Sequence, residues 1–246
     1  MEKEITSIGS LIENLNEDIG DYDEDVWFRG EACFDWKLLP GIFRSEKKIS
    51  EEILLTRFRQ SASMLIDTSP KSDFDWMFLM QHYGVQTRLL DWSESALASL
   101  YFAISEEDHL LKDGTLWMLK PVELNKLANI EDENKYYIPS FDDVHLTNYG
   151  IQSLKGNTRI QMNPIATIAT RNNARIQAQQ GVFTIHHSKD KPLEDYCEIN
   201  KQIFKYRIPK NSKLRLKKEL ELLSFNRFSL FPELSSIGLL LKDKMK

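Results

Sequence analysis

The segment from Gln81 to Ala103 constrains the fold more than any other stretch of the chain. Gly84 stands where a helix commonly ends in a left-handed cap, and the apolar run that follows it is too short for a helix. From Ser93 onward, apolar residues recur at helical spacing, with Ser93 as the expected cap. The segment therefore predicts a helix, a glycine turn, a short strand and a second helix. The buried face of that second helix would carry Ala96, Leu97, Leu100, Tyr101 and Ile104.

Three polar side chains bracket the apolar pair of the predicted strand, namely Thr87, Arg88 and Asp91. Groups of this kind are costly to bury unless they are paired. The arginine and the aspartate lie three residues apart in the chain. They are interpreted either as an internal ion pair that stabilises the fold or as one wall of a polar site.

A second polar element follows the apolar run that ends at Phe28, where the chain continues with Arg29, Gly30 and Glu31. An arginine at the tip of a strand can direct its guanidinium into a cleft, and the glycine lets a ligand or a second backbone approach. Arginine also forks readily onto phosphate or carboxylate groups. A structural pair of Arg29 with Asp91 or with Glu31 is the alternative, and the residues alone leave both open.

The stretch from Arg175 to His187 predicts a strand around Phe183, with Gln179 and Gln180 at its entry. Neutral amides there can hold a hydroxyl or a backbone group, but they supply no charge.

Upstream, residues 129–164 show little periodicity. An irregular stretch of this length inside a domain is often a functional lid or a binding loop.

Composition and charge limit the classes of function. The chain has 246 residues and a net charge of −5, which argues against a general nucleic-acid binder. Its two cysteines favour a reducing, cytoplasmic setting, and it has no apolar run long enough to span a membrane. Alternating aspartates at 21–25 lack the glycine and the closing glutamate of a calcium loop, and the adjacent histidines at 186–187 point to opposite faces of a strand. No metal site is expected.

Several sequence blocks together resemble the FRG domain family, which is named for the Phe-Arg-Gly present here at residues 28–30. The other blocks are LLPGIFR (38–44), HYGVQTRLLDWSESALASLYFA (82–103), RIQAQQGVF (175–183) and LFPEL (230–234). The resemblance implies one FRG domain over residues 1–246 and a bacterial or phage-related intracellular setting, but no established reaction. The expected fold is α+β, with antiparallel sheets and flanking helices.

A weaker resemblance links the early aromatic-Arg-Gly strand to ADP-ribosyltransferases, in which that arginine holds the phosphates of NAD. It implies an ADP-ribosyltransferase-like fold, in which residues 89–103 lie behind the nicotinamide ribose and residues 175–183 supply a late catalytic strand. The family pattern has a glutamate on that strand, whereas this chain has Gln179 and Gln180. Either Glu31, Asp91 or Glu94 takes the catalytic role, or the protein binds a nucleotide without catalysing its cleavage.

The leading hypothesis is a cleft for NAD or a similar nucleotide, of ADP-ribosyltransferase or NAD glycohydrolase type. Arg29 would grip phosphate, Trp92 or Tyr101 would stack on a ring, and Gln179 would orient a ribose hydroxyl. Gln179, Asp91 and Glu31 are the catalytic candidates, and Arg29, Thr87, Arg88, Trp92 and Tyr101 are the ligand-binding candidates. This hypothesis requires Arg29 and Gln179 to line one cavity.

Two alternatives come from other classes of protein. The polar motifs can be an internal network in a non-catalytic module that binds another protein. The third hypothesis is a nuclease that uses Asp91, Glu94 and His82, although the negative net charge disfavours a nucleic-acid substrate.

Overall fold

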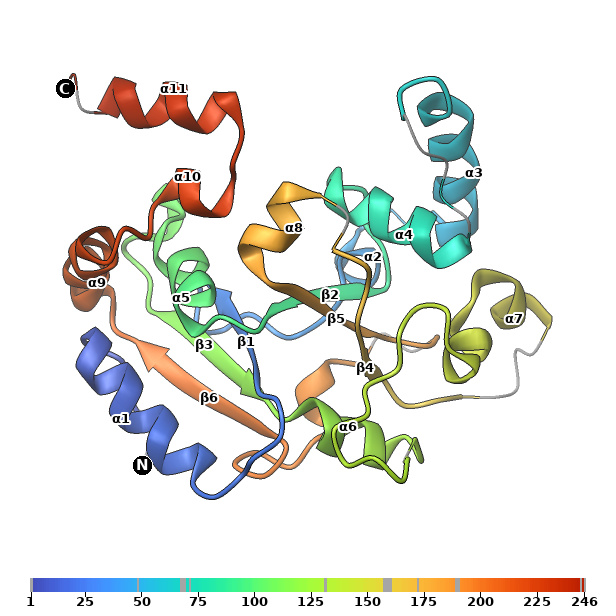
Figure 1. Ribbon diagram of the computed structural model, residues 1–246, viewed down its shortest axis with the longest axis horizontal. Helices are drawn as coiled ribbons and strands as arrows, with labels where there is room; N and C mark the ends of the chain where they lie inside the picture. Colours follow the sequence, from blue (N-terminus) through green and yellow to red (C-terminus); the bar gives the residue numbers. More distant parts are fainter. Residues whose placement is uncertain are drawn as a thin grey trace.

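One antiparallel sheet, in the spatial order β4-β5-β2-β1-β3-β6, contains the six strands found in the described residues (Figure 1). The computed structural model describes residues 2–47, 49–66, 70, 72–130, 132–156, 161–171, 173–188, 191–243 and 245. The strands are β1 (Trp27–Glu31), β2 (Leu89–Ser93), β3 (Gly114–Leu119), β4 (Ile165–Thr167), β5 (Gly181–Ile185) and β6 (Ile203–Ile208). The predicted antiparallel α+β fold is confirmed.

Helices flank the sheet and connect its strands. They are α1 (Ile8–Ile19), α2 (Gly41–Arg44), α3 (Glu51–Ala62), α4 (Asp73–His82), α5 (Ala96–Ile104), α6 (Pro121–Leu127), α7 (Ile151–Gly156), α8 (Ala174–Gln179), α9 (Lys210–Leu222), α10 (Arg227–Leu230) and α11 (Leu234–Asp243). Short 3-10 turns are η1 (Glu107–His109), η2 (Val144–Tyr149) and η3 (Leu193–Asp195). In the described part of the chain, no helix is long and apolar enough to cross a membrane.

The central segment has the predicted order of elements. Helix α4 ends at His82, and Gly84 follows with a φ of +79°, a conformation that favours glycine. Strand β2 and helix α5 come next. The predicted cap was wrong by two residues, because the side chain of Ser95 accepts the hydrogen bond from the Ala98 N–H. Ser93 instead accepts from the Ser95 N–H and donates to the carbonyl oxygen of Gln179.

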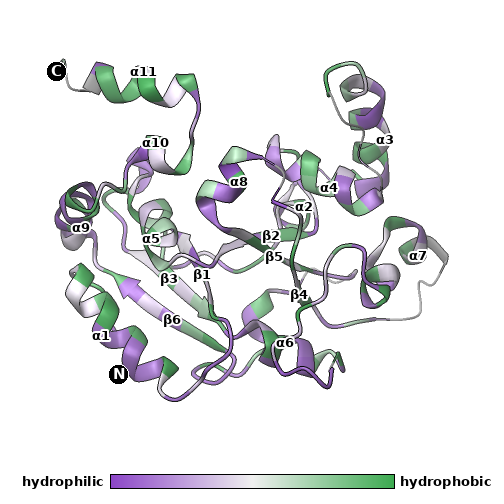
Figure 2. Cartoon of the chain, viewed as in Figure 1, coloured by the Kyte–Doolittle hydropathy of each residue, from purple (hydrophilic) through white to green (hydrophobic). Residues whose placement is uncertain are grey.

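Three apolar clusters hold helices against the sheet. On one face, a cluster around Trp27, Trp92 and Trp117 joins all six of these strands to α6. On the other face, α1, α5 and α9 cover β1, β3 and β6, whereas α3, α4 and α7 pack near β2, β4 and β5. Figure 2 shows β4 and β5 as largely apolar and α9 as largely hydrophilic, as expected for buried strands and a helix with a solvated face.

Strands β1 and β2 separate soon after they meet. Over their fully described lengths they share a single register pair, Phe28 with Ser93, while β1 pairs with β3 along all five of its residues. The register of β1 with β3 places the Arg29 side chain on the same face as Trp117. Arg29 therefore lies in the middle of β1, not at its tip as predicted, and beside the gap that opens between the two strands.

Gly30 fixes how closely α5 packs on β1. A Cβ atom built on Gly30 would lie 1.7 Å from the carbonyl oxygen of Ser99 and 2.9 Å from the backbone nitrogen of Ala103. Both contacts are with helix backbone, so no side-chain rotation can relieve them. Gly30 was predicted to admit either a ligand or a second backbone. The structure shows the second of these, because the backbone of α5 packs against it.

Much of the described part of the irregular segment 129–164 packs into the core. Phe141, Leu146, Tyr149 and Ile151 are buried against the apolar cluster around α4 and β5. None of the described residues of this segment lines the cavity that opens where β1 and β2 separate. Ile151 and Leu154 instead line a second cavity, of about 400 Å³, beside Arg88, so the expectation of a lid or binding loop stays a prediction.

Candidate functional site

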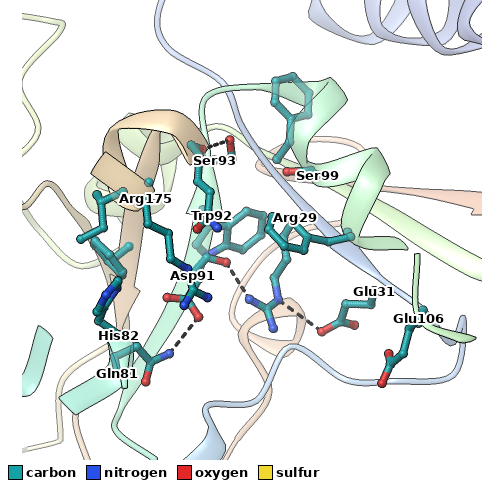
Figure 3. Close-up of a pocket in the computed structure, with 18 of the residues that line it drawn as sticks. Arg29, Glu31, Gln81, His82, Asp91, Trp92, Ser93, Ser99, Glu106 and Arg175 are labelled. Atoms are coloured by element: carbon teal, nitrogen blue, oxygen red, sulfur yellow. Dashed lines mark hydrogen bonds and ion pairs between the residues drawn. The ribbon is translucent and has the colours of Figure 1, made fainter. Parts of the chain in front are cut away.

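A cavity of about 380 Å³ lies where β1 and β2 separate (Figure 3). Its walls come from both strands, from α4, α5 and α8, and from the segment that follows β1. The charged and polar lining residues used below are Arg29, Glu31, Arg44, Gln81, His82, Asp91, Glu106, Arg175 and Gln179, and the aromatic ones include Trp36 and Phe102. The predicted meeting of Arg29 and Gln179 in one cavity thus occurs, although their side chains point to different partners.

Arg29 bridges the gap between the two separated strands. Its Nε donates to Glu31 Oε1 at 3.2 Å, and its Nη1 donates to the carbonyl oxygen of Asp91 at 2.7 Å. It therefore pairs with the carboxylate of Glu31 and with the backbone, not the side chain, of Asp91. The second hydrogen bond replaces a strand-to-strand bond at a position where the ladder is absent.

Glu31 is the most buried carboxylate of the cavity, with 4% of its surface exposed. Arg29 holds Oε1, whereas Oε2 is buried and has no hydrogen-bond partner among the described residues. Buried polar atoms are nearly always paired in native proteins, and unpaired ones mark positions that ligands or water complete. Glu31 thus lines the cavity with a carboxylate that is only half satisfied by the described residues.

Asp91 extends into the same cavity from β2 and is held by a chain of two side-chain hydrogen bonds. Gln81 Nε2 donates to Asp91 Oδ2 at 2.8 Å, and Thr87 Oγ1 donates to Gln81 Oε1 at 2.7 Å. Thr87 is fully buried and does not line the cavity. It was predicted as a ligand-binding residue, but in this structure it positions Gln81, which in turn positions Asp91.

Two further arginines reach the cavity without a carboxylate partner. Neither Arg44, at the end of α2, nor Arg175, in α8, forms an ion pair within the described residues. Partial burial lowers the pKa of Arg44 from its usual value, and the nearby Arg29 adds to that effect. The guanidinium carbon of Arg175 lies 4.8 Å from the ring centre of Phe231. The site therefore has cationic groups that an anion would stabilise.

His82 enters the cavity from the last turn of α4. Figure 3 shows it beside Arg175, with Asp91 and Arg29 lying between it and Glu31. Burial lowers the pKa of His82 below its usual value, and the charge of Arg175 lowers it further, while Glu233 and Asp91 act in the opposite direction. The imidazole is therefore mostly neutral at pH 7.

Arg88 was predicted to bind a ligand, yet it is the centre of a buried network outside this cavity. Its Nε donates to Glu51 Oε2 at 2.7 Å, and its other nitrogens donate to the carbonyl oxygens of Tyr149, His186 and His187. Only 3% of its surface is exposed. Arg88 thus has a structural role, because three distant segments meet at its guanidinium.

The two predicted stacking residues also serve the core. Trp92 contributes to the cavity lining, but its ring lies in the apolar cluster on the other face, where Nε1 donates to Thr184 Oγ1 at 3.0 Å. Tyr101 packs in the cluster beneath α1 and α9 and does not line the cavity. Trp36 and Phe102 are among the other aromatic residues that line the cavity, and neither was singled out from the sequence.

The late stretch contains the predicted strand around Phe183, but the residues before it are helical. Residues 174–179 form α8, Gln180 adopts a left-handed cap with a φ of +47°, and the strand begins only at Gly181. Gln179 lines the cavity, but its Nε2 donates to the carbonyl oxygen of Leu230 at 3.1 Å. Glu94 pairs with Arg171 at 2.5 Å and does not line the cavity. Among the described residues, no three His, Cys, Asp or Glu side chains are grouped so as to hold a metal ion.

Residues 24–111 match the model of a family described as the FRG domain. The resemblance predicted from the motifs is thereby confirmed for this part of the chain, which includes β1, β2, α4 and α5 and thus most of the cavity wall. The two later blocks, at 175–183 and 230–234, lie outside the matched range. No curated protein and no solved structure matches the chain.

Proposed function

We propose that the cavity binds NAD or a closely related nucleotide, and that Glu31 assists cleavage of the bond between nicotinamide and ribose. The proposal depends mainly on one observation. A carboxylate oxygen, Glu31 Oε2, is buried without a partner among the described residues in a cavity that also holds three arginines. The arginines suit the phosphates, and the carboxylate suits the reacting sugar.

The charges support an anionic ligand that carries a positive charge at one end. Arg44 and Arg175 form no ion pair within the described chain, and arginine is the side chain best suited to phosphate. Glu31 and Glu106 lie on the opposite side of the cavity from Arg175 in Figure 3, whereas Arg44 is near enough to Glu31 and Asp91 to interact with their charges. NAD has this distribution of charge, because its nicotinamide ring is cationic and its diphosphate is anionic.

Glu31 also supplies the carboxylate that the late stretch lacks. Cleavage of the glycosidic bond develops positive charge on the ribose, and a carboxylate stabilises that charge far better than an amide does. Because Arg29 holds Oε1, the free Oε2 has a fixed position. Gln179 cannot take this role, since it is neutral and its amide is bonded to Leu230.

The rings at the cavity fit the same ligand. Trp36 and Phe102 line it from different elements, and the edge of Trp36 is packed against His109, with ring centres 4.9 Å apart. An aromatic ring held in this way can stack on a nicotinamide or an adenine base. Trp36 and Phe102 therefore replace Trp92 and Tyr101 as the proposed stacking residues.

A non-catalytic protein-binding module is the second candidate. The observation that favours it is the structural use of much of the motif: Gly30 admits α5, and Arg88 joins three distant segments. The unpaired charges at the cavity favour the nucleotide proposal instead, because a purely structural network would pair them.

The variant Glu31→Gln tests the proposal. We expect it to lower kcat for nicotinamide release from NAD by roughly 100-fold, as is typical when one charge-stabilising group is removed from a transition state. Glu221→Gln, which changes an exposed carboxylate on α9, is the matched control and should leave the rate unchanged. Calorimetry should show that Glu31→Gln still binds NAD. A variant with the wild-type rate would refute the role of Glu31.

A further inference from the structure

We propose that His82 is the general base of this reaction, and that the acceptor it deprotonates is an O–H group, either water or a hydroxyl. The inference rests on the proposed function, because it assigns the second half of the same reaction. It adds a catalytic residue and restricts the chemical class of the acceptor.

The position of His82 carries the inference. Its ring lines the cavity, and neither ring nitrogen forms a hydrogen bond with a described side chain or backbone group. Figure 3 places it on the opposite side of the labelled side chains from Glu31, with Arg29 and Asp91 lying between them. In glycoside hydrolysis, a base and a carboxylate on opposite sides of the sugar leave room for the incoming water. A ribose bound against Arg29 and Asp91 would have His82 on one side and Glu31 on the other.

The charged groups around His82 come from several elements. Arg175 faces it from α8, Asp91 from β2 and Glu233 from the segment between α10 and α11, while the neighbouring Tyr83 packs edge-on with ring centres 5.0 Å apart. Burial is the largest influence, and it favours the neutral imidazole. A neutral imidazole can accept a proton at physiological pH.

The reaction balances with these groups and the substrates alone. The bond between the ribose C1′ and the nicotinamide nitrogen breaks, and its electron pair returns to the nicotinamide ring, which leaves as a neutral molecule. Glu31 faces the positive charge that develops on the ribose. The acceptor oxygen forms the new bond to C1′, and its proton passes to a ring nitrogen of His82, which later releases it to solvent. With water, the products are nicotinamide, ADP-ribose and one proton.

The same surroundings disfavour a cationic acceptor. Arg175 lies beside His82 and would repel a guanidinium or ammonium acceptor, a repulsion that Asp91 and Glu233 oppose, although each of them has a smaller influence on His82 than Arg175 has. A neutral O–H group avoids that repulsion. Among acceptors, water and hydroxyl-bearing molecules are therefore favoured over arginine or lysine side chains.

The pH dependence of NAD cleavage tests this assignment, together with the variants His82→Gln and His82→Ala. We expect the wild-type rate to fall at acid pH with an apparent pKa below the ordinary histidine value of about 6.5. His82→Gln should lower kcat by roughly 100-fold and remove that acid limb, while NAD affinity changes little. Added imidazole should restore part of the rate of His82→Ala. His145→Gln, at an exposed histidine outside the cavity, is the control and should behave as wild type.

The outcomes separate the two proposals. If NAD binds and is cleaved, but His82→Gln keeps the wild-type rate and acid limb, the base assignment is overturned and the role of Glu31 is unaffected. Failure of the wild-type protein to bind NAD in calorimetry would overturn both. Because His82→Gln retains a polar side chain of similar size, it keeps the test decisive if His82→Ala fails to fold.

Discussion

Replacing Gly30 with alanine is expected to lower the free energy of unfolding by more than about 3 kcal/mol, at or beyond the upper end of typical overpacking costs. The added Cβ would lie 1.7 Å from the Ser99 carbonyl oxygen, so α5 must move away from β1. That movement would disturb the apolar cluster of α1, α5 and α9 and the position of Arg29 together. Most of the purified variant should therefore be unfolded or aggregated at 37 °C.

Thermal melts followed by circular dichroism measure this effect. The control is Gly238→Ala in α11, where a new Cβ meets no atom within 4 Å and alanine is the better helix former. The control should melt at or slightly above the wild-type temperature. If Gly30→Ala melts within about 3 °C of wild type, a shift of about 1 kcal/mol for a chain of this size, the close packing of α5 on β1 is wrong.

The second large effect is expected for Arg88→Met, which should lower the unfolding free energy by about 3 to 5 kcal/mol. Methionine fills similar space but leaves Glu51 as a buried carboxylate without its partner. It also removes the donors to the carbonyl oxygens of Tyr149, His186 and His187. Unsatisfied buried groups of this kind are among the most costly defects in a folded protein.

Urea titration of Arg88→Met, Glu51→Gln and the double variant isolates the buried pair. We expect the double variant to be more stable than the sum of the two single losses, because the unpaired carboxylate is then absent. Arg57→Met, at an exposed arginine on α3, should change stability by less than about 0.5 kcal/mol. Equal stabilities of Arg88→Met and the wild type would contradict a structural role for Arg88.

The sequence predicted the helices and strands of the central segment better than it predicted which groups their polar side chains contact. The order α4, glycine turn, β2 and α5 follows from local periodicity and turn chemistry, which is why it was correct. Arg29 and Arg88 looked alike in the sequence. Their different surroundings depend on the separation of β1 from β2 and on partners such as Glu51 and Tyr149, which lie far away in the chain.

The local pattern already carried information on the two predicted stacking residues. Successive residues of a strand point to opposite faces, which is why the Trp92 ring packs in the apolar cluster although Trp92, like Asp91, contributes to the cavity lining. Tyr101 shares the apolar helical face of Leu97 and Ile104, which already argued for a place in the core. Arg44 and Trp36 carried a weaker signal, since only tertiary packing brings α2 and the loop after β1 to the cavity.

Isothermal titration of NAD and ADP-ribose tests the central claim most directly, because it asks whether the cavity binds a nucleotide at all. The wild-type protein should bind both ligands with one site per chain. Arg44→Ala and Arg175→Ala should each weaken binding about tenfold, equivalent to about 1.4 kcal/mol, while Arg57→Ala should not change it. No detectable binding of either ligand at about 1 mM, or unchanged affinity in both cavity variants, would contradict a nucleotide site between β1 and β2.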